Sequence, residues 1–234
     1  MADLDSAEWS SGTLLAQLSP VARARVVQLG VPRTYQPDEV LLAEGERTTH
    51  MILLLGGFVR VTKRGFEGRS SLIDMRGAGD TIGELAAKDG LPRSATVTAA
   101  ERVWARQFSR EAYFGLRRDV DFMTALDATD GHRNRYHGRR ALDSKEAEPT
   151  RFARVLAELA VTYGIRDGRG CVLPPPFVVA DLAELSGMSR PAAQRILRDL
   201  ELRRLVELDD PQLRVPHLGR LGEVAYPGQE IPVW

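Results

Sequence analysis

The feature that most constrains this chain is a series of short strand-like segments between Val40 and Phe108. The segments read EVLLAEG, HMILLLGGFVRVTKRG, RSSLIDM and SATVTAAERVWARQFS, and glycines separate them. Short strands at regular spacing, with turn residues between them, are typical of an antiparallel sandwich or barrel. We therefore expect the first half of the chain to be built mainly from an antiparallel β-structure.

Helical patterns flank the strand-like region. Before it, LSPVARARVVQLG predicts a short helix with Ser19 as N-cap, Pro20 at the first helical position and Gly30 just past the end. After Ser109 the sequence has no strand-like alternation and no proline until Pro149. This stretch predicts a short helix followed by a long one, and we place the boundary to a second unit near Pro149.

The second unit begins with TRFARVLAELAVTYG, which puts Phe152, Val155, Leu156 and Leu159 on one helical face. IRDGRGCVLPPP predicts a loop or a short strand. VVADLAELSGMSRPAAQRILRDLELRRLVEL then predicts a helix, a tight turn and a second helix. LVELDDPQLRVP predicts a small hairpin with Asp-Pro at its turn.

The helix pair has the features of a helix-turn-helix. Ala183 is small where two helices would cross, Gly187 can take the positive φ of a turn, and Ser189 caps a second helix that has Pro191 in its first turn. Five arginines and two acids lie between Ser189 and Arg204. A basic second helix followed by a β-wing favours DNA binding. The alternative is a helical hairpin with a solvated arginine face. The apolar residues expected to hold the pair are Leu182, Leu185, Met188, Ile196, Leu197 and Leu200.

The beginning of the second helix would carry the DNA contacts. Its N-terminal residues reach base edges in the major groove, which makes Arg190, Gln194 and Arg195 the candidate base readers. Arginine can bind guanine with two hydrogen bonds, and glutamine can bind adenine in the same way. Ser189 and Arg198 complete the expected DNA-binding set.

Composition limits the possible classes of protein. The formal net charge is zero, so a nucleic-acid surface must be local. The single cysteine, Cys171, excludes an internal disulfide framework and fits a reducing cytoplasm. The longest apolar run, MILLLGGFV, is too short to cross a bilayer, so we expect a cytoplasmic protein with no membrane partner.

A second motif, GELAAKDGLPRSA, could hold a small anion. Glu84 follows a glycine, and Arg93 comes nine positions later, directly before Ser94. A buried monoanion requires a charged fork together with backbone donors, and a ribose diol requires a carboxylate. The alternative is that Glu84 and Arg93 simply pair with each other.

Together these motifs resemble the cyclic-AMP receptor protein/FNR (Crp/Fnr) family of bacterial transcription regulators. The similarity runs from about Leu14 to Leu221: TIGELAAKDGLPRSATVTA resembles the family's phosphate-binding cassette, and GMSRPAAQRIL its recognition helix. The resemblance implies an α+β fold with three parts. These are a cyclic-nucleotide-binding-type β-roll over 13–118, a long dimerisation helix over 119–148 and a winged helix-turn-helix over 149–221.

The resemblance also implies roles for the residues of the anion motif. Glu84 matches the glutamate that accepts a hydrogen bond from the ribose 2′-hydroxyl, and Arg93 matches the arginine that pairs with the cyclic phosphate. Gly83, Leu85 and Ser94 would complete the phosphate shell. A cyclic nucleotide similar to cyclic AMP is therefore the candidate effector, and no other cofactor is assigned.

Two positions depart from the family's pattern. Tyr136 and His137 stand near the places where cyclic-AMP binders contact adenine with a Thr-Ser type pair, and both are bulky. The effector could thus be another nucleotide or another anion, or the roll could be empty. On the recognition helix, Pro191 replaces the family's usual glutamate.

Other functions of the family find less support. An iron–sulfur sensor needs several cysteines, and none of the four histidines is assigned as a haem ligand. We assign no metal-binding or catalytic residue, since the chain has no G-x-S-x-G, H-E-x-x-H, P-loop or G-x-G-x-x-G motif. We therefore do not expect an enzyme.

The expected partners are pseudo-palindromic double-stranded DNA, a second copy of the chain, and, as a candidate, RNA polymerase at the TYGIRDGRG loop. Two alternatives stay open: a cyclic-nucleotide-binding regulatory module that does not act on DNA, and a DNA-binding regulator that needs no ligand.

Overall fold

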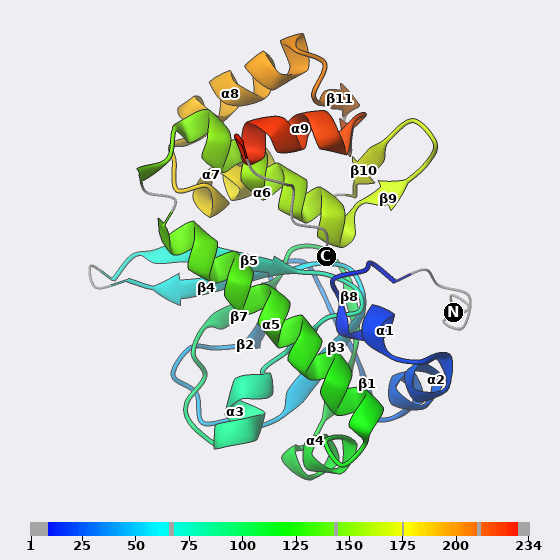
Figure 1. The fold of residues 1–234 in the computed structure, drawn as a ribbon. Coiled ribbons are helices and arrows are strands. Elements are labelled where there is room, and N and C mark those ends of the chain that lie inside the picture. The colour runs from blue at the N-terminus through cyan, green and yellow to red at the C-terminus, as the bar shows by residue number, and fades with distance from the viewer. Residues whose placement is uncertain (1–8, 66–67, 143–144, 175, 210–211, 229–234) are drawn as a thin grey trace. The chain divides into compact units, whose positions relative to one another are not determined.

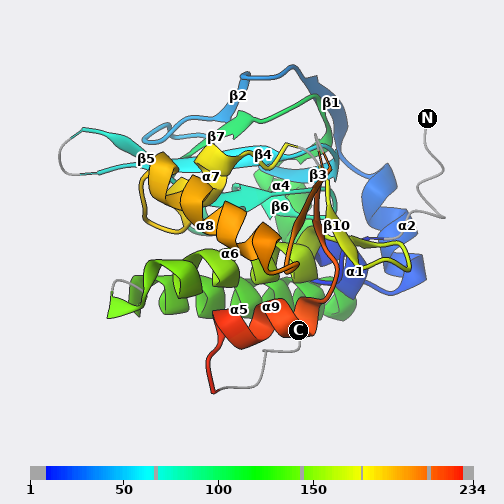
Figure 2. The same cartoon turned by 90° about the horizontal axis from the view of Figure 1, so that it is seen from above.

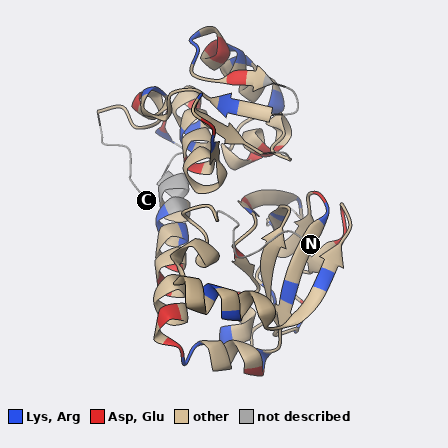
Figure 3. Ribbon diagram, turned by 90° about the vertical axis from the view of Figure 1, so that its right-hand side faces the viewer, with Lys and Arg blue, Asp and Glu red and all other residues tan. Residues whose placement is uncertain are grey.

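The computed structural model describes residues 9–65, 68–142, 145–174, 176–209 and 212–228. Its contacts divide the chain into two compact units, residues 1–131 and 132–234, and we describe each by itself. None of the helices in the described stretches is long and apolar enough to span a bilayer. Figure 3 shows acidic and basic residues spread over both units, in agreement with the zero net charge.

The first unit contains a roll of two antiparallel sheets, as the sequence predicts (Figure 1). One sheet has the strand order β1-β8-β3-β6 and the other has the order β2-β7-β4-β5. The strands are β1 (Val31–Tyr35), β2 (Val40–Leu42), β3 (Met51–Gly56), β4 (Val59–Arg64), β5 (Ser70–Arg76), β6 (Thr81–Ile82), β7 (Thr96–Ala99) and β8 (Val103–Phe108).

Strand β3 is buried on both faces. Ile52 and Leu54 pack into the apolar cluster inside the roll, whereas Met51 and Leu53 join a second cluster formed with the helices. This explains why MILLL reads as a continuous apolar run instead of an alternating one. Strand β1 was not predicted, because it contains Pro32 and pairs only with β8 at the sheet edge.

Helices cover the outer face of the sheet that contains β3. They are α1 (Leu14–Gln17), α2 (Pro20–Gln28), α4 (Arg110–Leu116) and the first part of α5 (Val120–Leu142). Tyr113 of α4 and Phe122 of α5 are fully buried in the same cluster as Phe108. Figures 1 and 2 show the first part of α5 along one side of the roll. The predicted short helix and long helix are both present, and α5 continues through Gly131 and Gly138 without a break. The long helix was predicted to extend to 148, but α5 ends at Leu142.

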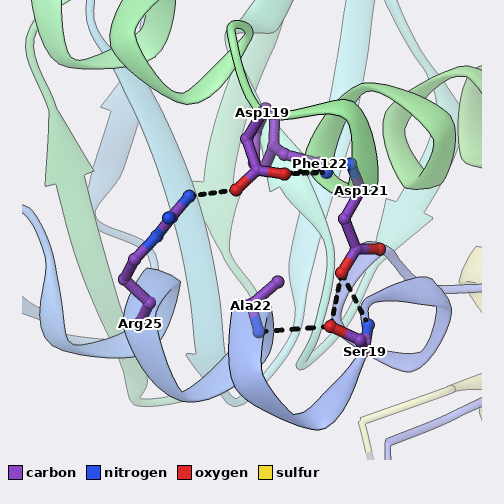
Figure 4. Close-up of polar contacts among 6 residues, drawn as sticks. All are labelled: Ser19, Ala22, Arg25, Asp119, Asp121 and Phe122. Carbon is purple, nitrogen blue, oxygen red and sulfur yellow. Dashed lines mark hydrogen bonds and ion pairs between the residues drawn. The ribbon is translucent and has the colours of Figure 1, made fainter.

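Two polar links join α2 to the start of α5 (Figure 4). The hydroxyl of Ser19 donates to Asp121 and also accepts from the backbone N–H of Ala22, so it caps α2 as predicted. Arg25, further along α2, forms an ion pair with Asp119. Asp119 also accepts hydrogen bonds from the N–H groups of the first turn of α5. The N-terminal helix thereby fixes the place where α5 begins.

The second unit confirms the predicted helix, turn, helix and hairpin. Its sheet has the order β11-β12-β10-β9, and the hairpin turn, residues 210–211, lies outside the described residues. Helix α9 was not predicted, since Gly219 and Gly222 weaken its helical pattern. The elements are α6 (Glu148–Tyr163), β9 (Ile165–Arg166), β10 (Cys171–Leu173), α7 (Val179–Leu185), α8 (Arg190–Leu202), β11 (Glu207–Asp209), β12 (Gln212–Val215) and α9 (Leu218–Ala225).

Helix α6 is the central helix of this unit, and its apolar face is buried as predicted. Two of its charged side chains are buried as well. Arg154 donates to the carbonyl of Ala225 at 3.1 Å, and Glu158 accepts from the hydroxyl of Tyr226 at 2.8 Å. These bonds attach the C-terminal end of α9 to α6 and satisfy polar groups that would otherwise be costly to bury.

Candidate functional site

The anion motif begins with a left-handed turn. Gly83 has φ 79° and ψ 7° and is the N-cap of the short helix α3 (Glu84–Asp89). A Cβ at Gly83 would lie 2.6 Å from Nη1 of Arg93 and 3.0 Å from the carbonyl oxygen of His50. Only glycine fits both this backbone conformation and this close approach.

Arg93 lies beside Gly83 and is almost completely buried, with 4% of its surface exposed. Its guanidinium makes three hydrogen bonds to neutral acceptors. Nε donates to Oγ1 of Thr48 at 2.9 Å, Nη1 to the carbonyl of Gly83 at 2.9 Å, and Nη2 to the carbonyl of His50 at 2.8 Å. These bonds hold the side chain in one orientation.

The charge of Arg93 is not neutralised by a direct partner. Within the described part of the chain, no carboxylate lies within ion-pair distance of the guanidinium, so the Glu84–Arg93 pair considered above is not formed. Burial lowers the pKa of Arg93, while Glu46 and Glu84 act in the opposite direction. Burial and the charge of Arg93 likewise lower the pKa of His50. The guanidinium of Arg93 is therefore a buried positive charge whose three hydrogen bonds go to neutral acceptors.

The other residues of the motif surround Arg93 at different depths. Glu84 is partly buried, and its Oε2 atom is shielded from solvent. Leu85 is 55% exposed, and Ser94 is also exposed. Thr48 and His50 were not predicted. His50 contributes through its backbone carbonyl, which has no signal in the sequence, and Thr48 is distant from Arg93 along the chain.

Tyr136 and His137, the positions expected to lie near the base of a bound nucleotide, are in α5 and belong to the second unit. His137 is partly buried, and the side chain of Tyr136 lies outside the described residues. Among the residues that the structure describes, no group of three His, Cys, Asp or Glu side chains could hold a metal ion.

The helix-turn-helix has the local geometry that its sequence predicts. The backbone N–H of Met188 donates to the carbonyl of Ala183 at 3.0 Å, and Gly187 has φ 63° in the turn. Ser189 caps α8 by accepting a hydrogen bond from the N–H of Ala192 at 3.4 Å. Of the six apolar residues predicted to hold the helix pair, all are buried except Met188, which is partly buried.

The polar residues of α8 lie on its accessible side. Arg190, Arg195 and Arg198 are exposed, and Gln194 is partly buried. The only acids of the helix, Asp199 and Glu201, lie near its C-terminal end. Its N-terminal half is therefore purely cationic, as a helix that approaches DNA phosphates requires.

Two family models match the two units. The cyclic nucleotide-binding domain matches residues 32–119, and the Crp-like helix-turn-helix domain matches residues 150–224. The chain belongs to the Crp/Fnr family. This Crp/Fnr protein is thus a DNA-binding transcription regulator, with an N-terminal roll and a C-terminal helix-turn-helix.

Similar proteins span nearly the same length. The CRP-like cAMP-activated global transcriptional regulator of Mycobacterium tuberculosis is 25% identical over 210 residues, which cover 89% of this chain and 94% of the relative. The cyclic AMP receptor protein of Thermus thermophilus is 27% identical, with coverages of 83% and 88%. The solved structure of FixK2 from Bradyrhizobium japonicum superposes with a TM-score of 0.73 at 18% identity, covering 86% of this chain and all of that one, and this likeness shows the fold.

Proposed function

We propose that this Crp/Fnr regulator acts as a homodimer whose Arg93 site binds the phosphate of a cyclic nucleotide. The buried guanidinium of Arg93 is the observation that carries the proposal. A guanidinium has five N–H donors, and three of them are used by Thr48, Gly83 and His50. Two donors of a fixed, desolvated cation are left for an anion, which would gain a strong charge-assisted contact.

Glu84 supplies the complementary group for a nucleotide. It is the first residue of α3 and directly follows Gly83, whose carbonyl binds Arg93. A carboxylate accepts hydrogen bonds from a ribose hydroxyl, whereas inorganic phosphate would be repelled by it. Arg93 and Glu84 together therefore favour a ligand that carries both a phosphate and a sugar. The curated relatives named above support this proposal through their names, which refer to cyclic AMP.

Tyr136 and His137 bear on the choice of base. They stand where the family's adenine contacts fall, and both side chains are larger than the usual threonine and serine. We propose that the preferred nucleotide differs from cyclic AMP in its base. Comparison of cyclic AMP with cyclic GMP and the cyclic pyrimidine nucleotides would reveal this preference.

Calorimetry with purified protein and this panel of cyclic nucleotides tests the ligand proposal. Arg93→Ala is expected to weaken binding by at least about 2 kcal/mol, as for loss of a charge-assisted hydrogen bond. Arg33→Ala is the matched control, because Arg33 is an exposed arginine of the same roll whose Nε bonds Gln107. Lack of binding by the wild-type protein up to millimolar concentration would remove the ligand claim.

A second candidate has its own support. The three hydrogen bonds of Arg93 also join Thr48, His50 and Gly83 into one wall, which is a structural role that needs no ligand. A regulator of this kind would bind DNA with the same affinity with and without nucleotides. The calorimetric experiment separates the two candidates, and DNA binding measured in parallel decides whether a bound nucleotide changes it.

For the DNA side, we propose that Arg190, Gln194 and Arg195 contact base edges, with Ser189 and Arg198 beside them. The support is that Arg190, Arg195 and Arg198 are exposed on a helix that Ser189 caps and whose opposite face is buried. Selection of binding sites from a random DNA library would define the half-site that they read.

A further inference from the structure

The wing is the β11–β12 hairpin. At its base, acidic and basic side chains lie next to one another. Arg214 lies in β12 and is paired in register with Glu207 of β11. Its Nη1 atom lies 2.6 and 2.5 Å from the two carboxylate oxygens of Asp167, in the turn between β9 and β10. Its Nε atom lies 3.8 Å from Oε2 of Glu207. Arg214 therefore connects the wing to the turn that follows β9, the strand at the opposite edge of the sheet.

This contact is shielded from solvent on the arginine side. The side chain of Arg214 is 8% exposed and that of Asp167 is 37% exposed. The hydrogen bond from Arg214 lowers the pKa of Asp167 and outweighs the effect of burial. Because the side chain of Arg214 is shielded, the pair constrains both segments more than an exposed ion pair would.

The turn that carries Asp167 is itself fixed. The backbone N–H of Arg169 donates to the Asp167 carboxylate at 3.1 Å, and the N–H of Asp167 donates to the carbonyl of Gly170 at 3.3 Å. The Arg169 side chain also reaches to 3.8 Å from Glu207. Asp167 is thus a rigid anchor for Arg214.

The wing is held at several points. Strand β11 has three residues and lies at the edge of the sheet, and so short a hairpin has little stability of its own. Its first end is held by the turn after α8, where Leu205 donates from its backbone N–H to Leu200 at 2.9 Å. On its other side β12 is paired with β10 over Leu213–Val215, and the Arg214–Asp167 contact adds a side-chain link to that pairing.

The wing is also acidic. Glu207 and Asp209 lie in β11, Asp210 follows Asp209 in the sequence, and the arginine of β12 contacts Asp167. An acidic hairpin that moves toward DNA phosphates repels them whatever the base sequence. The orientation of the wing relative to α8 therefore affects how closely α8 can approach DNA.

We propose that Arg214 and Asp167 are positioning residues for DNA binding, which hold the acidic wing against the β9–β10 turn while α8 enters the groove. Their loss should weaken binding to all DNA sequences alike. The base preference should be unchanged, because no base reader of α8 is altered. The proposal concerns DNA binding alone and does not depend on a cyclic nucleotide.

The test compares the full-length variants Arg214→Met and Asp167→Asn with wild type, without added nucleotide. The probes are a duplex of about 30 base pairs, selected by the wild-type protein, and a scrambled duplex of the same composition. Each variant should bind both duplexes roughly tenfold more weakly, and the ratio between the duplexes should be kept. The double variant should be no weaker than the weaker single variant. Arg33→Met, which removes an exposed arginine of the first unit that bonds Gln107, is the control and should bind like wild type.

Three results would overturn the proposal: unchanged DNA affinity in folded variants, a changed ratio between the two duplexes, or losses that add in the double variant. Circular dichroism and thermal melting establish that each variant is folded. If Arg214→Met does not fold, Asp167→Asn carries the test alone, because its side chain is more exposed and lies in a turn. Arg214→Lys, which keeps the charge, should recover part of the lost affinity.

Discussion

At the scale of single residues, the packing of Gly83 against Arg93 is the tightest constraint on the anion motif. Gly83→Ala should destabilise the protein for two reasons: alanine resists φ 79°, and its Cβ would meet Arg93 Nη1 at 2.6 Å. Gly45→Ala is the matched control, since Gly45 has φ 87° but open space around it. The left-handed conformation alone costs about 1–2 kcal/mol, so urea unfolding should show this loss for Gly45→Ala and a larger one for Gly83→Ala. Equal losses would mean that Arg93 moves aside freely.

Also at the residue scale, single substitutions near α8 should distinguish residues that contact DNA bases from residues that contact the DNA backbone. Arg195→Ala should cost about 1–3 kcal/mol at one base position and relax the preference for guanine there. Arg203→Ala should weaken all sequences alike or have no effect, because Arg203 follows the end of the helix and lies beside Asp199. Pro191 offers no side-chain acceptor, so the preference for cytosine that the family's glutamate supports should be absent. Selection from a random library checks all three, and an identical half-site for wild type and Arg195→Ala would exclude Arg195 as a base reader.

At the scale of elements, the start of α5 depends on Asp119. Burial of this carboxylate opposes its ionisation, but hydrogen bonds from the N–H groups of Asp121 and Phe122 and from Arg25 outweigh it and lower the pKa of Asp119 below 3.8. A group with a lowered pKa in the folded state stabilises the fold above its unfolded pKa. This stabilisation is lost as the pH falls through the lower, folded value.

Asp119→Asn should therefore be less stable than wild type at neutral pH, and the difference should shrink as the pH falls below 3.8. Chemical denaturation at a series of pH values measures it. Asp127→Asn is the control, because Asp127 is an exposed residue of the same helix. If the difference in unfolding free energy stayed constant with pH, the charge of Asp119 would not stabilise the start of α5.

At the scale of the whole molecule, we expect a dimer. A single helix-turn-helix makes few phosphate contacts, so tight binding at physiological salt needs two. Mass measurement in solution should give twice 25.9 kDa. The operator should be a pseudo-palindrome with half-sites one helical turn apart. A monomer that binds a single half-site with full affinity would contradict this expectation.

The sequence by itself determined the elements whose signals are local. The cap at Ser19, the turn at Gly187, the cap at Ser189 and the glycine-separated strands each depend on neighbouring residues, and the structure has them where they were predicted. The family resemblance came from the same local motifs. Strand and turn patterns were sufficient to predict an antiparallel sandwich or barrel and a winged helix-turn-helix, and the resemblance to the Crp/Fnr family specified the first of these as a β-roll.

Only the tertiary structure decided which partners the buried charges have. Arg93 binds Thr48 and the carbonyls of Gly83 and His50 instead of Glu84, and Arg214 binds Asp167 across the sheet. Backbone carbonyls have no residue-specific signal, and contacts between residues tens of positions apart depend on strand order and register. Strand β1 and helix α9 were missed for the same reason: their proline and glycines oppose local structure, and pairing with β8 and packing on α6 overcome that preference.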